Sequence, residues 1–525
     1  MKKTEKIFIF LVGALLVCSV IISSILAYTG CRHSYYSTVK DSWTPLVLMG
    51  DSIIVHVLFA LGAGAFLGLL DWWMRKKLSI GAQEKLAVVV LVLSALVIFI
   101  VGTVFVQMNP YYPAGDQLNT TAGSYYCLHG NYMMLTKGGY IGLYEQQKGF
   151  MFLYEILFWI FGDFCYKVAG EFHVIFAVMT LYFGYAFIKL HFEKPSCRMI
   201  YSMLMAVCFP FLIYLPYIYG DIPSICFCTI LFWALSKYAV AFKKGYIVLG
   251  AVVSALALMC RMNTWIVLIA VAIGLVLLSI QKKAYQPLIA ALCILLSAAG
   301  AIKAVNVMYE VRSGYESGVG IPSVLWIAMG LQETNGEAGV YNRYQQGVFE
   351  SNDFEREISA QIGKDYITVR LQEFKDNPAM AKDFFWKKMS SQWTEPLFES
   401  IISTSTFKED RAVPGWIQNL YHGPARDTVW KLANYYQSFV YVAFCLFTLG
   451  GLIGIRKDKF CSTKWIPLIA IVGGFLFSLM WENQCRYCLP YYMFILMYVP
   501  QGFMQVEIWI KTVIRNRKKK ALQQA

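Results

Sequence analysis

The chain has 525 residues, of which 58% are hydrophobic and only 15% are charged. Several apolar runs are continuous and long enough to cross a hydrocarbon core of about 30 Å, which takes roughly 20 helical residues. Because a chain in lipid satisfies its backbone as helices or as a closed barrel of alternating strands, this composition excludes a β-barrel and predicts an all-α polytopic membrane protein.

Twelve apolar segments are predicted to be transmembrane helices, and short segments rich in lysine and arginine alternate with them. The positive-inside rule assigns these basic segments and both chain termini to the cytoplasm. The net charge of +14 therefore indicates orientation and contact with membrane lipids, and no nucleic acid partner is expected. The predicted spans are 7–28, 47–70, 86–107, 170–190, 199–218, 222–241, 246–260, 263–280, 286–305, 434–454, 464–481 and 489–510.

The first of these runs needs a separate decision, because an N-terminal apolar segment can also be a signal peptide. Its apolar part is longer than the usual signal core of about 7–15 residues, and no small-residue cleavage site follows it. It is therefore predicted to be a retained first helix of a multi-pass cell-membrane protein.

Three regions follow from these spans. Residues 1–305 form a predicted N-terminal transmembrane module with an outer loop at 108–148, residues 306–433 a small extracytoplasmic α-rich domain, and residues 434–525 the last helices with a basic tail. The stretch "GFMFLYEILFWIFG" (149–162) is short and contains Glu155. As a full span it would move the basic segment 189–198 outside, so it is predicted to be an interfacial helix on the outer face. A thirteenth, tilted span is the alternative.

Ionisable residues on the predicted outer face point to chemistry at the membrane surface. Asp116 carries a carboxylate that can accept a proton from a hydroxyl, Lys148 lies at headgroup level, and Arg486 can bind a phosphate through two hydrogen bonds. The ordinary alternative is that such residues are solvated or snorkel to the interface.

Five short motifs occur in an order that resembles the GT-C superfamily of lipid-dependent membrane glycosyltransferases. They are an outer aspartate in the first large loop, "YEQQKGFMFLYEILFWIFG", "YLPYIYGDIPS", "CRMNTW" and "ENQCRYCLPYYMF". The resemblance covers most of the chain from Asp116 to Pro490 and is strongest to the protein mannosyltransferase and aminoarabinose transferase group, of the glycosyltransferase family 39 type. Each motif is short, so the specificity lies in their order.

The resemblance implies roles for individual residues. Asp116 matches the first-loop aspartate that acts as base or acceptor anchor, and Lys148 matches the lysine that contacts the donor phosphate. Asp221 matches the second-loop aspartate and is the second candidate catalytic residue. We expect it to orient the acceptor or the loop, and the alternative is that it is the nucleophile of a retaining reaction. Arg486 and Tyr487 match the arginine and tyrosine of a late turn that binds the donor phosphate.

The sequence departs from the family pattern in two respects. Two spans precede the one leading to the first-loop aspartate where the family often has one, and Gln117 stands where protein mannosyltransferases have an acid. The second departure weakens the case for a protein acceptor. Candidate residues on the acceptor or substrate side are Gln117, Arg261, Gln332, Glu333, Tyr341 and Asn342. Arg261 is expected first of all to form a salt bridge with a nearby acid.

The predicted activity is transfer of a monosaccharide from a polyprenyl-phosphate donor to an acceptor hydroxyl at the outer face, with inversion at the anomeric carbon. The acceptor is a cell-surface glycan, a lipid or a protein. We expect no obligatory metal, and a magnesium or manganese ion held by Asp116 and Asp221 is the alternative. A flippase or transporter for lipid-linked glycans and a ligase of wall polymers are the rival functions.

Three further features leave alternatives open. Asp51 is the alternative base, although the sequence suggests no basic partner beside it. Cys485 and Cys488 form a C-x-x-C pair without a second pair, and in an apolar chain a free cysteine usually behaves as a small hydrophobic residue. Cys31 and Cys127 are candidates for a disulfide.

Overall fold

The computed structural model describes residues 3–37, 46–407, 412–454, 462–505 and 509. Most of these residues are helical, and two short antiparallel hairpins are the sheets of the described part. The N-terminal half contains α1 (Lys3–Arg32), β1 (His33–Ser37), β2 (Leu46–Gly50), α2 (Ile53–Lys77), α3 (Ile80–Met108), α4 (Asp116–Leu128), η1 (Met133–Leu135), α5 (Tyr140–Leu143), η2 (Glu145–Gln147), α6 (Lys148–Phe161), η3 (Gly162–Phe164), α7 (Cys165–His191), α8 (Pro195–Ala206), α9 (Phe209–Ile213), α10 (Asp221–Ala241) and α11 (Lys244–Cys260). The C-terminal half contains α12 (Thr264–Lys282), α13 (Gln286–Ser313), α14 (Ser323–Gly330), β3 (Glu333–Thr334), β4 (Glu337–Ala338), α15 (Tyr344–Ser351), α16 (Arg356–Asp376), α17 (Pro378–Thr394), α18 (Ser400–Ser403), α19 (Gly415–His422), α20 (Pro424–Gly454), α21 (Ser462–Met480), η4 (Cys485–Cys488) and α22 (Leu489–Leu496).

Eight helical segments of the described chain are long and apolar enough to cross a membrane. Each of them overlaps one predicted span, and their length and composition are consistent with an all-α polytopic membrane protein. They are Ile53–Lys77, Ile80–Met108, Glu145–His191, Asp221–Ala241, Thr264–Lys282, Gln286–Ser313, Pro424–Gly450 and Ser462–Met480. Of the other predicted spans, 7–28 falls within α1 and 246–260 falls within α11, which has 17 residues.

Two predicted spans, 199–218 and 489–510, are not single helices in the described chain. The first is divided into α8 and α9, and the second into α22 and a separate helical segment at 499–505. α8 ends at Ala206 and α22 at Leu496, each four residues before a proline, Pro210 and Pro500. A proline ring clashes with the carbonyl four residues earlier and lacks the N–H for the helical hydrogen bond, so both helices end there.

The predicted second span begins too early and ends too early. Residues 46–50 are strand β2, paired with β1 in the register His33 to Gly50, and α2 begins only at Ile53 and continues to Lys77. The turn to α3 is short because the Ser79 hydroxyl caps the next helix by accepting a hydrogen bond from the Ala82 N–H at 3.3 Å. Most of the basic segment "WWMRKKLSIGAQEK" (72–85), which we expected to be a loop between the second and third spans, is therefore helical.

Both predicted region boundaries, at 305/306 and 433/434, fall inside helices. α13 continues to Ser313 because its last turns pack on α6, where Glu155 accepts hydrogen bonds from Tyr309 and Arg312, both at 2.6 Å. The segment between the boundaries is rich in helix, as expected. It is also joined to the bundle, since Trp393 of α17 is fully buried in the main hydrophobic core.

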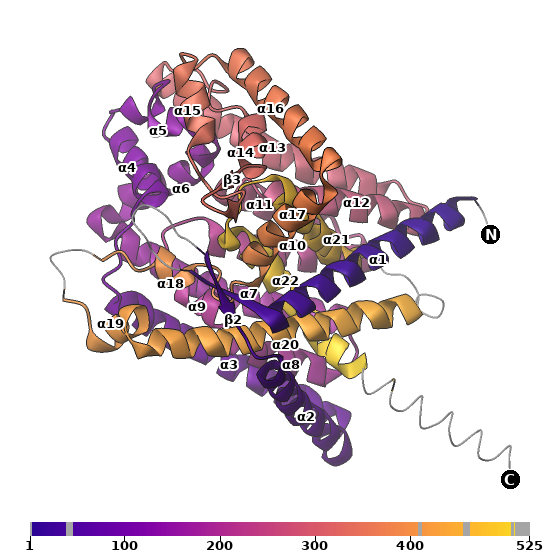
Figure 1. Ribbon diagram of the computed structural model, residues 1–525. Helices are drawn as coiled ribbons and strands as arrows, with labels where there is room; N and C mark the ends of the chain where they lie inside the picture. The colour runs from indigo at the N-terminus through magenta and orange to yellow at the C-terminus, as the bar shows by residue number, and fades with distance from the viewer. Residues whose placement is uncertain (1–2, 38–45, 408–411, 455–461, 506–508, 510–525) are drawn as a thin grey trace, which may run out of the picture.

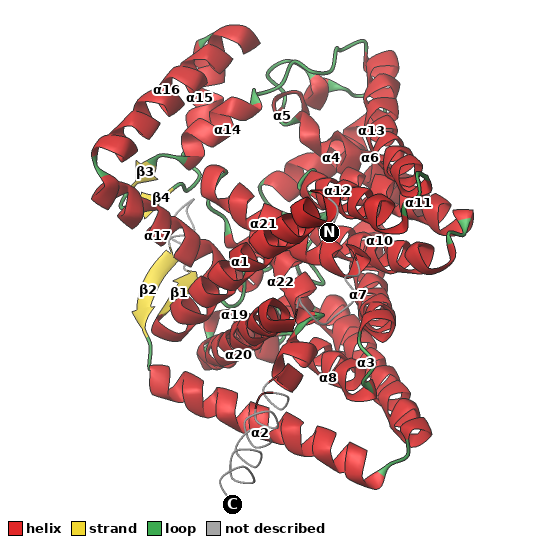
Figure 2. Ribbon diagram, turned by 90° about the vertical axis from the view of Figure 1, so that its right-hand side faces the viewer, coloured by secondary structure: helices red, strands yellow, loops and turns green. Residues whose placement is uncertain are grey.

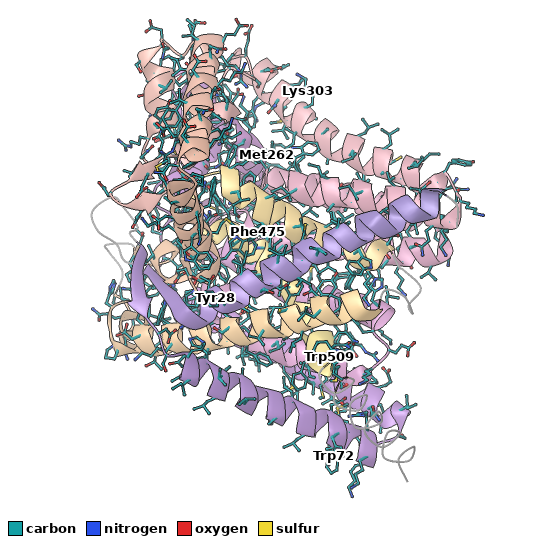
Figure 3. All side chains as sticks on the ribbon, turned by 45° about the vertical axis from the view of Figure 1, so that its right-hand side comes forward. Tyr28, Trp72, Met262, Lys303, Phe475 and Trp509 are labelled. Atoms are coloured by element: carbon teal, nitrogen blue, oxygen red, sulfur yellow. The ribbon has the colours of Figure 1, made fainter. Side chains whose placement is uncertain are left out.

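The elements far apart in sequence lie close together in the bundle. α1 runs along α20, α10 packs on α7 and α11, and α12 packs on α21 (Figure 1). Helices α14 to α16 lie at one end of the molecule and α2 at the opposite end (Figure 2). Apolar side chains of α2 project away from the bundle, among them Trp72 (Figure 3), as expected for a helix surrounded by lipid.

Candidate functional site

Asp116 is the first residue of α4, directly after the turn at Gly115, whose φ of +54° favours glycine. Its side chain is exposed, and the Tyr140 hydroxyl donates a hydrogen bond to its Oδ1 at 2.9 Å. Burial and then the negative charge of Asp116 raise the pKa of Tyr140 and of Tyr219. Asp116 is thus oriented by one tyrosine and lies within electrostatic reach of a second.

Gln117, the next residue, is partly buried and forms hydrogen bonds with two tyrosines. Its Oε1 accepts a hydrogen bond from the Tyr111 hydroxyl at 2.5 Å, and its Nε2 donates to the Tyr217 hydroxyl at 2.8 Å. Arg486 donates to the same Tyr217 hydroxyl. A single phenol therefore connects the start of α4 to η4.

Arg486 is buried, with 6% of its surface exposed, and its hydrogen bonds go to neutral groups. Besides Tyr217, its partner is the Gln484 side-chain oxygen at 2.9 Å. Its guanidinium also lies 5.2 Å from the ring centre of Tyr219 and 5.6 Å from that of Tyr487. Within the described residues, no carboxylate lies within ion-pair distance of it.

Arg261 also lies over these two tyrosine rings, 4.8 Å from the ring centre of Tyr219 and 5.4 Å from that of Tyr487. In contrast to Arg486, it pairs with a carboxylate, because its guanidinium lies 3.4 Å from Asp221 Oδ1. The predicted salt bridge of Arg261 is thereby confirmed. The second oxygen of Asp221 is buried and has no hydrogen-bond partner in the described part of the chain.

The turn before α10 and the end of α11 are packed backbone against backbone, which brings Asp221 to Arg261. A Cβ on Gly220 would lie only 2.0 Å from the carbonyl oxygen of Cys260, so this approach requires glycine. A small pocket lies beside the ion pair, and its polar lining includes Ser224, Asn263 and Thr264.

Replacement of Arg261 by methionine is expected to destabilise the protein, because it leaves the buried Asp221 carboxylate without its counter-charge. Breaking a buried ion pair costs about 3–5 kcal/mol. Thermal unfolding of the detergent-solubilised variant should show a clearly lowered midpoint, and Arg261→Lys, which keeps the charge, should lie between the variant and the wild type. An unchanged midpoint for Arg261→Met would contradict this role.

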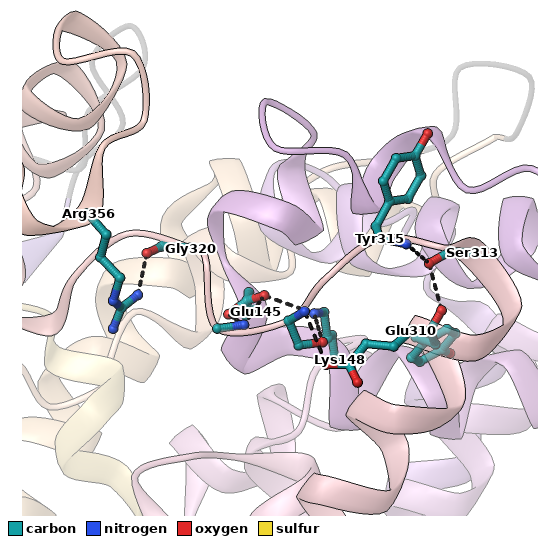
Figure 4. A network of polar contacts seen from close by, with 10 residues as sticks. Glu145, Lys148, Glu310, Ser313, Tyr315, Gly320 and Arg356 are labelled. Carbon is teal, nitrogen blue, oxygen red and sulfur yellow. Dashed lines mark hydrogen bonds and ion pairs between the residues drawn. The ribbon is translucent and has the colours of Figure 1, made fainter.

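Lys148 lies at the first turn of α6 and is buried, but it does not join the two arginines. Its ammonium group donates to Glu145 Oε1 at 3.0 Å and to the Ser317 hydroxyl at 2.7 Å (Figure 4). Glu145 also accepts from the backbone N–H of Gly318. The adjacent Gln147 donates to the Tyr219 hydroxyl, so this network borders the site.

The candidate acceptor residues of the 330–342 segment fall into two places. Asn342 donates to Gln332 at 2.7 Å, and Glu333 lies 3.7 Å from the ammonium group of Lys387, so these three belong to a local hairpin network. The Tyr341 hydroxyl lies 3.4 Å from that of Tyr144, which is close to Asp116 through Tyr140. Tyr341 is therefore the member of this group that reaches the site.

Asp51, the alternative base, lies at the start of α2 and has the basic partner that we did not expect. His56 Nε2 lies 2.6 Å from its Oδ2, and Asn434 of α20 donates to the same oxygen at 2.5 Å. These contacts connect α2 to α20. Asp51 thus has a structural explanation that does not require catalysis.

Neither cysteine pair forms a disulfide that the structure describes. Cys127, Cys485 and Cys488 are buried free thiols, whereas the side chain of Cys31 lies outside the described residues. In the described part of the chain, no three histidine, cysteine or acidic side chains lie close enough together to hold a metal ion.

Sequence reasoning missed Glu482 and the tyrosines that hold the site together. Glu482 is 4% exposed and accepts a hydrogen bond from the Tyr487 hydroxyl at 3.1 Å. Burial and the negative charge of Asp116 raise its pKa to about 8. The sequence did contain a signal for Glu482, because this acid lies four residues before Arg486 and begins the motif "ENQCRYCLPYYMF".

These residues form one cluster around the side chains of Tyr217, Tyr219 and Tyr487. Its charged and acidic members are the exposed carboxylate of Asp116, the guanidinium groups of Arg261 and Arg486, and the buried carboxyl of Glu482. No model of a known protein family and no curated protein sequence matches the chain. The assignment of function therefore rests on the chemistry of this cluster.

Proposed function

We propose that the chain is a membrane glycosyltransferase of the GT-C type, which transfers a monosaccharide from a polyprenyl-phosphate donor to an acceptor hydroxyl. The acceptor is a cell-surface glycan, a lipid or a protein. The proposed orientation has both termini in the cytoplasm and the cluster around Tyr219 at the outer face of the membrane, where a lipid-borne sugar is presented.

The observation that carries this proposal is the bonding of Arg486. A buried guanidinium that is satisfied only by neutral groups and aromatic faces retains a full positive charge, and burying such a charge without an anion is costly. A phosphate is the ligand that the planar, multiply donating guanidinium recognises best. The Arg486 site therefore suits the single phosphate of a polyprenyl-phosphate sugar.

Asp116 supplies the complementary chemistry. Its carboxylate is exposed and is oriented by Tyr140, so it can take the proton of an incoming hydroxyl. The bond that breaks joins the anomeric carbon to a phosphate oxygen, and Arg486 would stabilise the charge that develops on that oxygen. Gln117, the chain neighbour of Asp116, donates to the Tyr217 hydroxyl, to which Arg486 also donates, so two side chains connect the two positions.

Inversion at the anomeric carbon is the favoured outcome. A retaining reaction needs a carboxylate that attacks the anomeric carbon itself. Asp221 is 1% exposed and is paired with Arg261, so it is poorly suited to that attack. We assign Asp221 to holding Arg261 and the 219–221 turn, and Lys148 to the neighbouring network of Glu145 and Ser317.

The test is transfer of label from radiolabelled polyprenyl-phosphate monosaccharides in membranes that contain the full chain, compared with membranes that lack it. Transfer that depends on the chain supports the proposal, and the active donor names the sugar. Movement of the donor across the membrane without transfer of its sugar would instead support the flippase.

A further inference from the structure

Glu482 is held in place by its chain neighbour. α21 ends two residues earlier, and Asn483 is anchored on three sides: its N–H donates to the Gly339 carbonyl at 2.7 Å, and its amide donates to the Ala338 carbonyl and to the Ser391 hydroxyl, both at 2.8 Å. The backbone at 482 is thus fixed by the β4 turn and α17. The position of the Glu482 carboxyl is consequently a property of the fold.

The Glu482 carboxyl contacts the hydroxyl of Tyr487, and both Arg261 and Arg486 lie over the ring of this tyrosine. The Tyr487 hydroxyl donates to Glu482 Oε2 at 3.1 Å, and the faces of the Tyr487 ring contact Arg261 and Arg486. In the described residues no cation lies within ion-pair distance of Glu482. Glu482 and Arg486 therefore contact the hydroxyl and the ring of the same tyrosine, so a phosphate bound between them would contact both.

The surroundings of Glu482 favour its protonated form. Burial has the largest effect on its pKa, followed by the negative charge of Asp116, and together they raise it to about 8 although the Tyr487 hydrogen bond and Arg261 act in the opposite direction. A protonated carboxyl has an O–H that it can donate, which an ionised one lacks. Two carboxyl groups in one site with different protonation states are the usual arrangement of an acid and a base.

We propose that Glu482 donates its proton to the phosphate oxygen that leaves the anomeric carbon, opposite to Asp116, which accepts the proton of the acceptor hydroxyl. This inference rests on the proposed glycosyl transfer. The bond from the acceptor oxygen to the anomeric carbon forms, and the bond from that carbon to the phosphate oxygen breaks with its electron pair on the oxygen. The oxygen takes the Glu482 proton, giving polyprenyl phosphate as a monoanion, and exchange with water returns both carboxyl groups to their starting states.

The reaction should slow as the pH rises through about 8, because Glu482 loses the proton that it has to donate. The other ionisable groups that act on Glu482, or on which it acts, are Asp116 from α4, Tyr144, Arg261, Lys388 from α17, Glu399 and Tyr487. Among these, Glu399 and Lys388 also have a pKa near 7, so both need control variants.

The first measurement is the transfer rate of the full chain in membranes from pH 6.5 to 9.5. Glu482→Gln should reduce the rate at pH 7 about tenfold or more and should abolish the alkaline decline. Glu399→Gln removes a buried acid of similar pKa whose carboxyl accepts a hydrogen bond from the Cys485 N–H, and Lys388→Met removes the buried amine. Both controls should retain the decline, and a decline that persists in Glu482→Gln overturns the proposal.

A binding measurement separates this inference from the proposed function. The affinity of the detergent-solubilised chain for farnesyl phosphate is measured at pH 7 and at pH 9.5. The decrease between these pH values should be about tenfold larger for the wild type than for Glu482→Gln, because only the wild type loses a hydrogen-bond donor. The titration of the ligand itself is common to both proteins and cancels in the comparison. If the ratio of the two affinities is the same at both pH values, Glu482 does not contact the phosphate and the proposal fails. If the ratio changes but no donor supports transfer, the contact stands and the glycosyltransferase assignment falls.

Discussion

Asp116→Asn is expected to reduce glycosyl transfer by at least a hundredfold. Asparagine preserves the size of the side chain and can still accept the Tyr140 hydrogen bond, but it cannot take a proton from the acceptor hydroxyl. General-base assistance contributes about 10²–10⁴-fold. The measurement is the rate of label transfer from the active polyprenyl-phosphate sugar in membranes with equal amounts of each protein.

The matched control for this change is Asp163→Asn, which removes an exposed carboxylate in η3 that lies outside the site. It should leave transfer unchanged, and detergent-solubilised chromatography should show that both variants are folded. Full activity in folded Asp116→Asn would move the base to Asp221 or Asp51, and the two corresponding asparagine variants would then distinguish these positions.

Arg486→Gln is expected to weaken binding of the donor phosphate about 10- to 150-fold. The estimate follows from the net loss of one hydrogen bond to a charged group, which is worth about 1.5–3 kcal/mol, because glutamine keeps a single donor group. Because Arg486 has neutral partners in the described structure, its removal leaves no orphaned carboxylate, and the variant should fold. Binding of farnesyl phosphate to the solubilised chain measures the effect.

Lys364→Gln is the control for Arg486→Gln, since it removes an exposed positive charge on α16, remote in sequence from η4. Arg486→Lys keeps the charge but loses the planar pair of donors, so its affinity should lie between those of the wild type and Arg486→Gln. Equal affinity in Arg486→Gln and the wild type would show that the phosphate binds elsewhere.

Hydrophobicity alone was sufficient to predict most of the long helices, since most of the long apolar runs became one helix each. The breaks after Ala206 and Leu496 were also encoded locally, in the prolines four residues later, but an apolar count does not register a missing N–H. The extension of α13 to Ser313 was not predictable in this way. It depends on Glu155, which lies more than 150 residues away in sequence.

The candidate site likewise contains residues that could be predicted from the sequence and residues that could not. Charged residues with motif-like neighbours, such as Asp116, Arg261 and Arg486, were identified from the sequence, and the structure brings them together. The tyrosines around which they gather were overlooked, because a tyrosine in an apolar run reads as core or as an interfacial anchor. The partner of Lys148 was unpredictable because Ser317 lies 169 residues further along the chain.

The packing of α1 along α20 has a consequence for biosynthesis. About 390 residues separate the end of the first helix from the start of its partner. At a synthesis rate of roughly 5–20 residues per second, α1 is complete for about 20 to 80 s before α20 emerges from the ribosome. During that interval another apolar partner has to cover the surface that α20 later takes, so chains truncated before residue 424 should retain α1 without its native packing partner.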